Sequence, residues 1–327
     1  MKFRTELNLS PSQFPLDPEK PVVLLGSCFT QSIGSRMRSS MWDARPNICG
    51  VLYNPLSIAD TLERAISIDS AAPMLADSIT SRENLFMSWL TDSSATSYSH
   101  AETLHRLNHS FHSLHDSLTA AQALIVTFGT AWVYELASEP GHTVANCHKF
   151  PASTFLRRRL TVSEITQRWQ HTATLLRRLA PDIRIILTVS PIRHLKDGFE
   201  GNCRSKAILQ LACEELCATL PDTEYFPSYE ILTDDLRDYR FYASDLVHPS
   251  DEAVDYIWQK FTDRYLTPES RDLLAQGERI TRALAHRPLI RSDSDTARLQ
   301  AARYRAEAIR RHDEFLRLHP GMLPSQL

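Results

Sequence analysis

Residues 21–30 read Pro-Val-Val-Leu-Leu-Gly-Ser-Cys-Phe-Thr, and this segment limits the fold more than any other part of the chain. Its apolar and β-branched residues predict a buried strand over 21–26, and the periodic apolar residues that follow predict a helix over 30–42. A buried strand that leads through a tight Gly turn into a helix is typical of α/β proteins with a parallel sheet. Ser27 is then expected at the carboxyl edge of the sheet and at a helix N-terminus, where ligands and negative charge are favoured.

A second motif lies far along the chain. Asp245 and His248 stand three residues apart in a predicted loop, just before a helix capped by Ser250. At this spacing a carboxylate can orient an imidazole and stabilise its charge. Ser27 is therefore a candidate nucleophile, with His248 as its general base and Asp245 as the group that holds the imidazole tautomer. The competing interpretation is that Ser27 only caps the helix, as most Ser residues at such junctions do.

The rest of residues 1–265 alternates strand and helix patterns. Buried strands are expected at 123–128, 183–189 and 224–226, with a short one at 47–53; helices are expected after Asn54 and at 103–121, 163–179, 205–220 and 250–264. This order predicts an α/β fold with a parallel sheet and right-handed crossovers. The Ser-, Thr- and Asp-rich stretch 67–103 is expected to be a long loop, and 135–155 an irregular segment.

After residue 265 the chain becomes charged and helical. Helices are expected at 268–287 and 296–318, and the second carries apolar residues at near-heptad spacing among Arg and acidic residues. We therefore expect a domain over 1–265 and a helical C-terminal extension over 266–327. Mixed charge favours packing on the domain or on another subunit over binding to nucleic acid or a membrane. A homo-oligomer formed through these helices is one expectation.

The composition of the chain argues against several classes of binding partner and of cofactor site. The chain has 327 residues and a formal net charge of −3, so it has no general attraction to nucleic acid or anionic membranes. No apolar run is long enough to span a bilayer, and the N-terminal residues lack the apolar core of a secretory signal. The six Cys residues include no Cys-x-x-Cys pair, which favours reduced thiols in a cytoplasmic protein without a cofactor.

The predicted helix 103–121 carries four His residues at helical spacing: His105, His109, His112 and His115. Such spacing can ligate a metal, but no carboxylate motif accompanies these residues. Solvated His side chains on an exposed helix face are therefore the preferred interpretation, and no metal site is expected.

Several stretches in chain order resemble the GSCFA family, within the SGNH (GDSL-like) hydrolase superfamily. They are Gly26–Thr30, Val51–Pro55, Phe128–Tyr134, Asn146–Lys149, Thr188–His194 and Asp235–Tyr242. The resemblance extends over roughly residues 20–262. It implies a three-layer α/β/α fold with a parallel, flavodoxin-like sheet. It also implies a serine hydrolase in which Ser27, His248 and Asp245 form the catalytic set.

The resemblance further implies an oxyanion hole. The backbone N–H of Cys28 and that of Gly50, after the second strand, are two expected donors. In the superfamily a Gly-x-Asn usually supplies another donor after the third strand, but here Gly129 is followed by Thr130. The Gly129 N–H, the Thr130 hydroxyl and the side chain of Asn54 remain open as replacements.

Two pairs of residues are candidate substrate contacts at the carboxyl edge of the sheet. His148 and Lys149 lie in a loop near the end of the third strand, and Arg193 and His194 follow the fourth. For Arg193 the competing interpretation is an ion pair with Asp197. His194 competes with His248 as the base, but no Asp stands three residues before it.

The residues and the resemblance together predict an ester hydrolase or acyl transferase that works through an acyl-Ser27 intermediate. The expected substrates are small-molecule or O-acetylated carbohydrate esters. The alternative is a non-catalytic binding or scaffold protein, which the missing Gly-x-Asn favours. A hydrogen bond between Ser27 Oγ and His248 Nε2 would separate the two interpretations.

Overall fold

The computed structural model describes residues 5–68, 75–286 and 295–324. The chain divides into two compact units. Unit 1 takes in the described parts of Met1–Leu7, Val22–Ser32 and Arg45–Ile257, and unit 2 those of Asn8–Pro21, Ile33–Ala44 and Trp258–Leu327. Unit 2 therefore combines the C-terminal helices with two segments from the N-terminal part of the chain, which composition alone did not indicate.

The main sheet has five strands in the order β10-β9-β5-β1-β2. Their bounds are Val22–Gly26 (β1), Ala44–Pro46 (β2), Ala123–Phe128 (β5), Arg184–Val189 (β9) and Thr223–Phe226 (β10). The pairs β1–β5, β5–β9 and β9–β10 run parallel. Numbered along the chain, the order is 2-1-3-4-5, the flavodoxin-like arrangement, which places a topological switch point between β1 and β5. The predicted α/β class and parallel sheet are confirmed.

The short strand predicted over 47–53 is wrong, because the strand at this edge is Ala44–Pro46. Asn47 ends it in a left-handed conformation with φ 49°, and its side-chain Oδ1 accepts the Gly26 N–H at 3.0 Å. A residue whose side chain bonds the neighbouring backbone competes with strand pairing. Residues 47–53 therefore form a loop that leads from β2 to the next helix.

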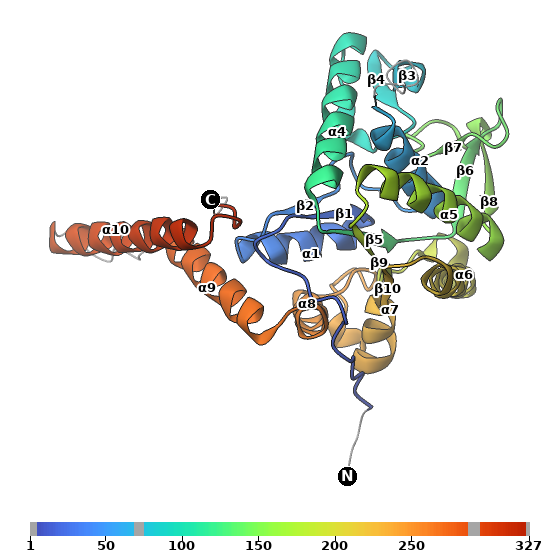
Figure 1. Ribbon diagram of the computed structural model, residues 1–327. Coiled ribbons are helices and arrows are strands. Elements are labelled where there is room, and N and C mark those ends of the chain that lie inside the picture. Colours follow the sequence, from blue (N-terminus) through green and yellow to red (C-terminus); the bar gives the residue numbers. More distant parts are fainter. Residues whose placement is uncertain (1–4, 69–74, 287–294, 325–327) are drawn as a thin grey trace. The chain divides into compact units, whose positions relative to one another are not determined.

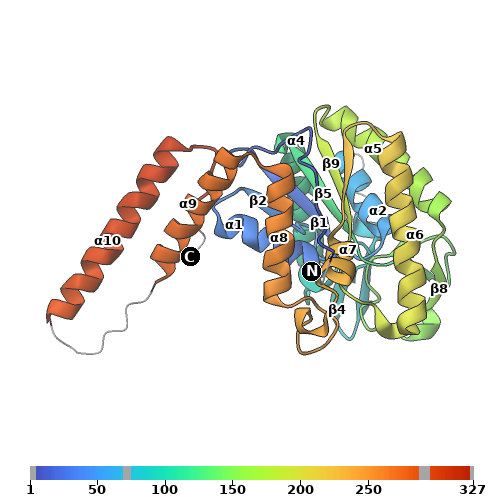
Figure 2. The ribbon, with the colours of Figure 1, turned by 90° about the horizontal axis from the view of Figure 1, so that it is seen from below.

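Helices cover both faces of the main sheet (Figure 2). They are α1 (Cys28–Ser39), α2 (Pro55–Ile66), α4 (His100–Ala120), α5 (Val162–Leu179), α6 (Gly198–Thr219) and α8 (Asp251–Tyr265). On one face, alternate strand residues such as Val23, Leu25 and Val126 pack with α2, α4, α5 and α6 in one continuous apolar core. The other face is flanked by the first turns of α1 and α8, which belong to unit 1. The fold is thus three-layer α/β/α, as expected.

Two small antiparallel sheets replace segments that were expected to be irregular. A hairpin joins β3 (Ile79–Arg82) to β4 (Leu85–Ser88), and a second sheet has the order β7-β6-β8, formed by Thr143–Val144, Trp132–Leu136 and Phe155–Arg159. The expectation of a long loop over 67–103 is therefore wrong. Within 135–155 irregular structure is confirmed for 137–142 and 145–151, but not for the residues of β6, β7 and β8. Trp89, Val144 and Phe155 form an apolar cluster between these segments, so burial by distant residues stabilises strands too short to be recognised alone.

Short helical turns connect the longer elements. They are η1 (Ser93–Ala95), η2 (Ala152–Thr154), η3 (Leu195–Asp197), α7 (Ser228–Glu230), the π-helical η4 (Ile231–Leu236) and η5 (Tyr239–Phe241). In chain order η3 follows β9, and α7, η4 and η5 follow β10, so they come after the carboxyl ends of these strands; α7 lies close to β10 (Figure 1).

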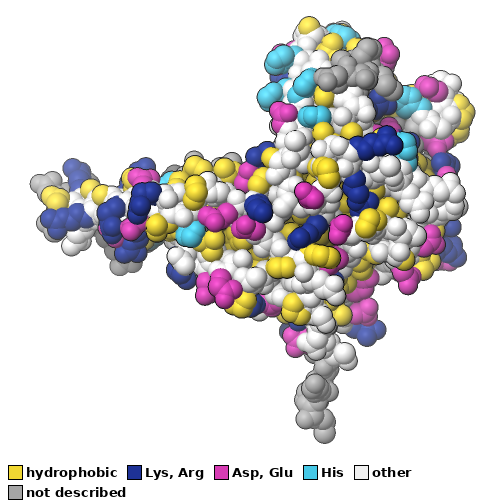
Figure 3. All heavy atoms as spheres, viewed as in Figure 1, with side chains coloured by type: hydrophobic (Ala, Val, Ile, Leu, Met, Phe, Trp, Pro, Cys, Tyr) yellow, Lys and Arg dark blue, Asp and Glu magenta, His cyan; other side chains and the backbone are white. Residues whose placement is uncertain are grey.

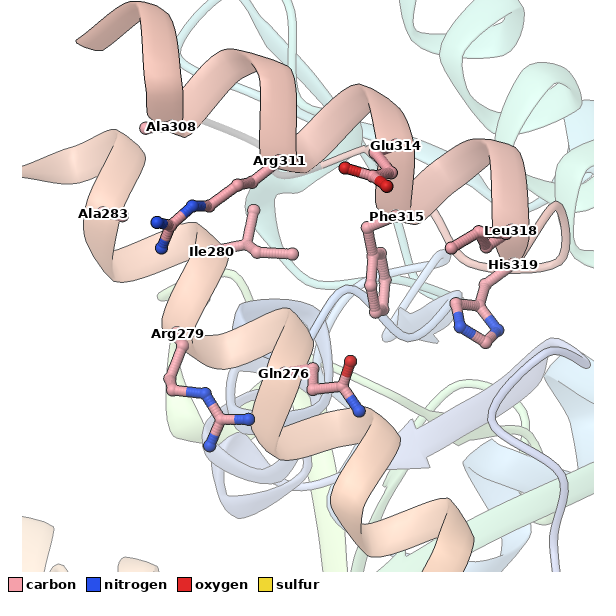
Figure 4. A pocket seen from close by; sticks show the side chains of 10 residues that line it. All are labelled: Gln276, Arg279, Ile280, Ala283, Ala308, Arg311, Glu314, Phe315, Leu318 and His319. Carbon is pink, nitrogen blue, oxygen red and sulfur yellow. The ribbon is translucent and has the colours of Figure 1, made fainter. Parts of the chain in front are cut away.

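The two expected C-terminal helices are confirmed as α9 (Pro268–Ala285) and α10 (Asp295–Leu318). Between them lies a cavity of about 320 Å³, into which the Phe315 ring points beside Ile280 and Gln276 (Figure 4). Elsewhere in unit 2 the Leu323 N–H donates to the Met41 carbonyl at 2.8 Å. Assembly of copies through α9 and α10 stays a prediction.

Histidine side chains gather over α4 (Figure 3). His105, His109 and His112 are exposed, and His115 places Nδ1 2.9 Å from the Ala65 carbonyl oxygen. Within the described ranges, no three His, Cys, Asp or Glu side chains are grouped so that they could hold a metal ion. Nor does any described helix have both the length and the apolar character needed to cross a membrane.

Candidate active site

The turn between β1 and α1 is built around Gly26. Its φ of 141° belongs to a region that side chains disfavour, and a Cβ at this position would lie 2.2 Å from the Thr127 carbonyl oxygen. This close approach of β1 to β5 lets the chain turn at once into α1, whose first residue is Cys28. Cys28 therefore stands at both the carboxyl edge of the sheet and the N-terminus of a helix.

Ser27 lies beneath this turn and has no exposed surface. Its Oγ donates a hydrogen bond to Ser190 Oγ at 3.0 Å, and its N–H donates to the Thr127 carbonyl at 3.3 Å. Thr127 lies near the carboxyl end of β5, and Ser190 directly follows β9. The structure therefore directs Ser27 toward the sheet, which corrects the expectation that its hydroxyl contacts His248.

The side chain that meets His248 is Cys28. Its Sγ lies 3.6 Å from His248 Nε2, and His248 Nδ1 lies 2.6 Å from Asp245 Oδ2. The other carboxylate oxygen of Asp245 accepts the backbone N–H groups of Val247 and His248 at 2.9 and 3.0 Å. This local turn fixes the carboxylate and imidazole together. The geometry is a thiol, an imidazole and a carboxylate in a line, the order of a nucleophile, its base and the group that orients the base.

The pKa values of Asp245 and Cys28 are shifted in opposite directions. The backbone N–H groups of His248 and Val247, followed by the His248 ring, lower the pKa of Asp245 to about 2, so it is a carboxylate at neutral pH. Burial raises the pKa of the Cys28 thiol above its ordinary value, although N–H groups at the start of α1 act in the opposite direction. The Cys28 thiol is therefore protonated at neutral pH, and His248 Nε2 lies where it could accept that proton.

Most of the oxyanion donors expected from sequence are engaged elsewhere. The N–H groups of Gly129 and Thr130 both donate to the Tyr53 carbonyl, at 2.8 and 3.0 Å, and the Gly50 N–H donates to the Asn47 carbonyl at 2.8 Å. These contacts correct the expectation that Gly50 and Gly129 offer backbone donors to a substrate.

The two side chains among the expected donors also have local partners. The Thr130 hydroxyl lies 3.2 Å from Ser205 Oγ. Asn54 caps α2: its Oδ1 accepts the Ser57 N–H at 2.8 Å, and Nδ2 donates one proton to Ser57 Oγ at 2.9 Å. The Cys28 N–H remains, because the first N–H groups of a helix have no partner within it.

A cavity of about 440 Å³ opens beside Cys28 and His248. Its walls include Cys28, Tyr53, Asn54, Thr130, Trp132, Tyr134, Asn146, Cys147, Arg157, Arg193, His194, Lys196 and His248. His148 and Lys149 are not in this wall, which corrects their assignment as substrate contacts. His148 instead places Nε2 2.7 Å from the Ser88 carbonyl oxygen, and Lys149 is exposed. The preceding residues of the same loop, Asn146 and Cys147, reach the cavity.

Arg193 and His194 both line the cavity, and their role as substrate contacts stays a prediction. The Arg193 guanidinium lies over the Tyr242 ring, 4.0 Å from its centroid, and Nη1 donates to the Leu246 carbonyl at 3.4 Å. Asp197 is not its partner, because this carboxylate receives two hydrogen bonds from Arg157 at 2.5 and 2.6 Å. Arg193 thus braces the loop that carries His248.

Lys206 is a site residue that sequence reasoning missed. It is 1% exposed, and its Nζ donates to the carbonyl oxygens of Gly129 and Ser190, both at 2.7 Å. It thereby links the residues that follow β5 and β9. Burial lowers its pKa to about 7, while the Cys28 thiolate would raise it. The sequence did contain an indication of its burial, because Lys206 shares one helical stripe with the apolar residues Leu209 and Cys213. A Lys buried on such a stripe needs polar partners.

The aromatic wall was also missed. Trp132 and Tyr134 come from β6, and Arg157 of β8 lies over the Trp132 ring at 4.2 Å from the centroid. Alternating aromatic residues in 132–136 were a strand signal, but the partner strand 155–159 carries three consecutive Arg residues and shows no apolar alternation.

Comparison with protein families gives a match to the GSCFA family over residues 21–261. This range contains β1, the Cys28 turn and the Asp245–His248 loop. A comparison with curated proteins gives no match.

Proposed function

This chain belongs to the GSCFA family, and we propose that it is an acyl hydrolase or acyl transferase whose nucleophile is the Cys28 thiol. The observation that carries the proposal is the 3.6 Å contact of Cys28 Sγ with His248 Nε2, together with the 2.6 Å contact of His248 Nδ1 with Asp245. Ser27, the nucleophile expected from sequence, is fully buried against Ser190. The thiol is half-buried and lines the cavity.

The proposed reaction has two halves. In the first, Cys28 Sγ attacks the carbonyl carbon of an ester while its proton passes to His248 Nε2. The tetrahedral intermediate collapses to a thioester, and His248 returns the proton to the leaving alcohol. In the second half, water or another hydroxyl gives its proton to His248 and attacks the thioester, which releases the acyl group and restores the thiol. Asp245 holds the imidazole in the tautomer that accepts a proton at Nε2.

The proposed substrates are small-molecule or O-acetylated carbohydrate esters. A cavity of about 440 Å³ is in the range of ordinary ligand pockets. Tyr53, Trp132 and Tyr134 give it aromatic surface, on which an acyl group or a sugar ring can lie, while Lys196 and Arg193 supply polar contacts at its wall.

Incubation with p-nitrophenyl acetate tests the proposal. We expect one acetyl group per chain on the peptide that contains Ser27 and Cys28, with release of one equivalent of p-nitrophenolate before any slower turnover. Neutral hydroxylamine should remove the acetyl group, since it cleaves thioesters much faster than oxygen esters. Intact mass before and after hydroxylamine is the measurement.

Two outcomes would contradict this assignment in different ways. A hydroxylamine-resistant acetyl group on the same peptide would return the nucleophile to Ser27. No acetylation of folded protein by p-nitrophenyl acetate, together with no labelling by a fluorophosphonate, would favour the binding or scaffold alternative.

The raised pKa of the Cys28 thiol makes a prediction about pH. The thiolate is the form that reacts with iodoacetamide, and below the pKa its fraction rises about tenfold per pH unit. Because burial raises this pKa from 9.0, alkylation of Cys28 should still be increasing at pH 9. The measurement is the alkylation rate of the Cys28 peptide between pH 6 and 9, with the exposed Cys203 of the same chain as internal reference. A plateau at neutral pH would instead indicate a preformed thiolate–imidazolium pair.

A further inference from the structure

The proposed acyl transfer needs hydrogen-bond donors for the carbonyl oxygen, which becomes negatively charged in the tetrahedral intermediate. The N–H groups of Gly50, Gly129 and Thr130 already have backbone acceptors. Of the donors expected from sequence, this leaves the Cys28 N–H and the second amide proton of Asn54 Nδ2. A buried donor that has no partner of its own would complete the site.

His194 offers a ring nitrogen that can act as such a donor. Its Nε2 atom is buried and has no hydrogen-bond partner among the described residues. A buried polar atom without a partner is costly, so it calls for a ligand or a function. The backbone of His194 is held in place because its N–H donates to Asn202 Oδ1 at 2.9 Å, and its ring packs edge-on to Tyr53 at 5.9 Å between centroids.

The imidazole edge points at the turn that carries the nucleophile. A Cβ added to Gly129 would lie 3.4 Å from both His194 Nε2 and Ser27 Cβ, so both atoms border one small space at the end of β5. Cys28 follows Ser27 in the chain, and it lines the same cavity as Asn54 and His194. The same Cβ would lie 2.9 Å from the Tyr53 carbonyl oxygen, so only Gly lets these groups come together at this point.

Burial, together with nearby positive charges, keeps the His194 ring neutral at neutral pH. Desolvation, followed by the positive charges of Lys206 and His248, lowers the pKa of His194 to about 4, and the negative charge of Asp197 acts in the opposite direction. A neutral imidazole carries one N–H and can donate a hydrogen bond without exchanging its proton. His248, beside its own carboxylate, is the imidazole placed to accept a proton.

We propose that His194 is a catalytic residue of this site, which donates its Nε2–H to the acyl oxygen as negative charge develops during attack by Cys28. It takes the place of the Asn side chain that a Gly-x-Asn after the third strand would supply, and it acts together with the Cys28 N–H. This inference rests on the proposed function. It assigns the two imidazoles of the site to different tasks: His248 transfers protons, and His194 stabilises the oxyanion.

Two reactions of the same thiol separate these tasks. Acetylation by p-nitrophenyl acetate passes through an oxyanion, whereas alkylation by iodoacetamide is a direct displacement at a saturated carbon and forms none. Both rates are measured for Cys28 in the wild type, in His194→Phe, which removes the donor, and in His194→Gln, which retains an N–H. We expect His194→Phe to acetylate about 10²-fold more slowly and His194→Gln to fall between it and the wild type, with alkylation unchanged in all three.

Each outcome decides a separate question. Equal acetylation of wild type and His194→Phe would overturn the role of His194 and leave Cys28 as nucleophile. An equal fall of both rates would also overturn it, since His194 would then act on the thiol. A wild-type Cys28 that cannot be acetylated would refute the proposed function itself. If His194→Phe lacks a cooperative thermal transition, the comparison is made with His194→Leu, and the His194→Gln rates remain a test in any case.

Discussion

Replacing Cys28 with Ala is expected to abolish acetyl transfer from p-nitrophenyl acetate, whereas replacing the adjacent Ser27 with Ala should leave it largely intact. Cys28 Sγ is the atom in contact with His248 Nε2, and Ser27 Oγ is bonded to Ser190 beneath the turn. Loss of a nucleophile that acts with a base typically lowers kcat by about 10³-fold or more. The measurement is the burst and steady-state rate of p-nitrophenolate release by each variant at equal protein concentration.

The two variants control for one another, because they change neighbouring residues of one turn. Ser27→Ala removes a buried hydrogen bond and should cost about 1 kcal/mol of unfolding free energy, which a thermal melt would detect without a matching loss of rate. Cys28→Ala should melt close to the wild type. An inactive Ser27→Ala beside an active Cys28→Ala would reverse the assignment and restore the serine mechanism expected from sequence.

Replacing Gly26 with Ala is expected to prevent stable folding. The new Cβ would lie 2.2 Å from the Thr127 carbonyl oxygen, an atom of the adjacent strand that cannot move without breaking the β1–β5 pairing. The residue would also be held at φ 141°, a conformation that L-residues rarely adopt. We expect a loss of about 4 kcal/mol or more in unfolding free energy, measured by urea denaturation or seen as insoluble expression.

Gly141→Ala is the matched control for this substitution. Gly141 also has a positive φ, 94°, but nothing lies within 4 Å of a Cβ built on it. Its replacement should therefore cost only the backbone strain, about 1 kcal/mol. An equal loss of unfolding free energy in the two variants would mean that the φ angle alone, and not the contact with β5, requires Gly at position 26.

The local motifs were the parts of the site that sequence predicted best. Asp245 and His248 belong to one short turn, in which the carboxylate accepts the N–H groups of Val247 and His248 and so must lie beside the ring. The strand–Gly–helix turn was predictable for the same reason, since apolar run, Gly and helix are neighbours in the chain. Contacts between residues that are close in the sequence depend little on the rest of the fold, so they can be predicted from the sequence.

The choice between Ser27 and Cys28 could not be made from the sequence. Successive residues at the start of a helix point about 100° apart, so a shift of one position exchanges a side chain that faces the sheet for one that faces the Asp245–His248 loop. Which of the two meets His248 depends on where α1 begins, at Cys28 rather than at residue 30. That start is set by the contact of β1 with β5.

The strand–helix alternation in the sequence by itself determined the α/β class and the parallel sheet, and the spacing of Asp245 and His248 determined the imidazole–carboxylate pair. Only the tertiary structure placed Cys28 against His248, buried Lys206 beneath Gly129 and Ser190, and left His194 Nε2 without a partner at the end of β5. Periodicity records which residues are apolar and how far apart they stand. It does not record which polar side chains from distant segments meet where the strands end, because those contacts depend on strand order and loop packing.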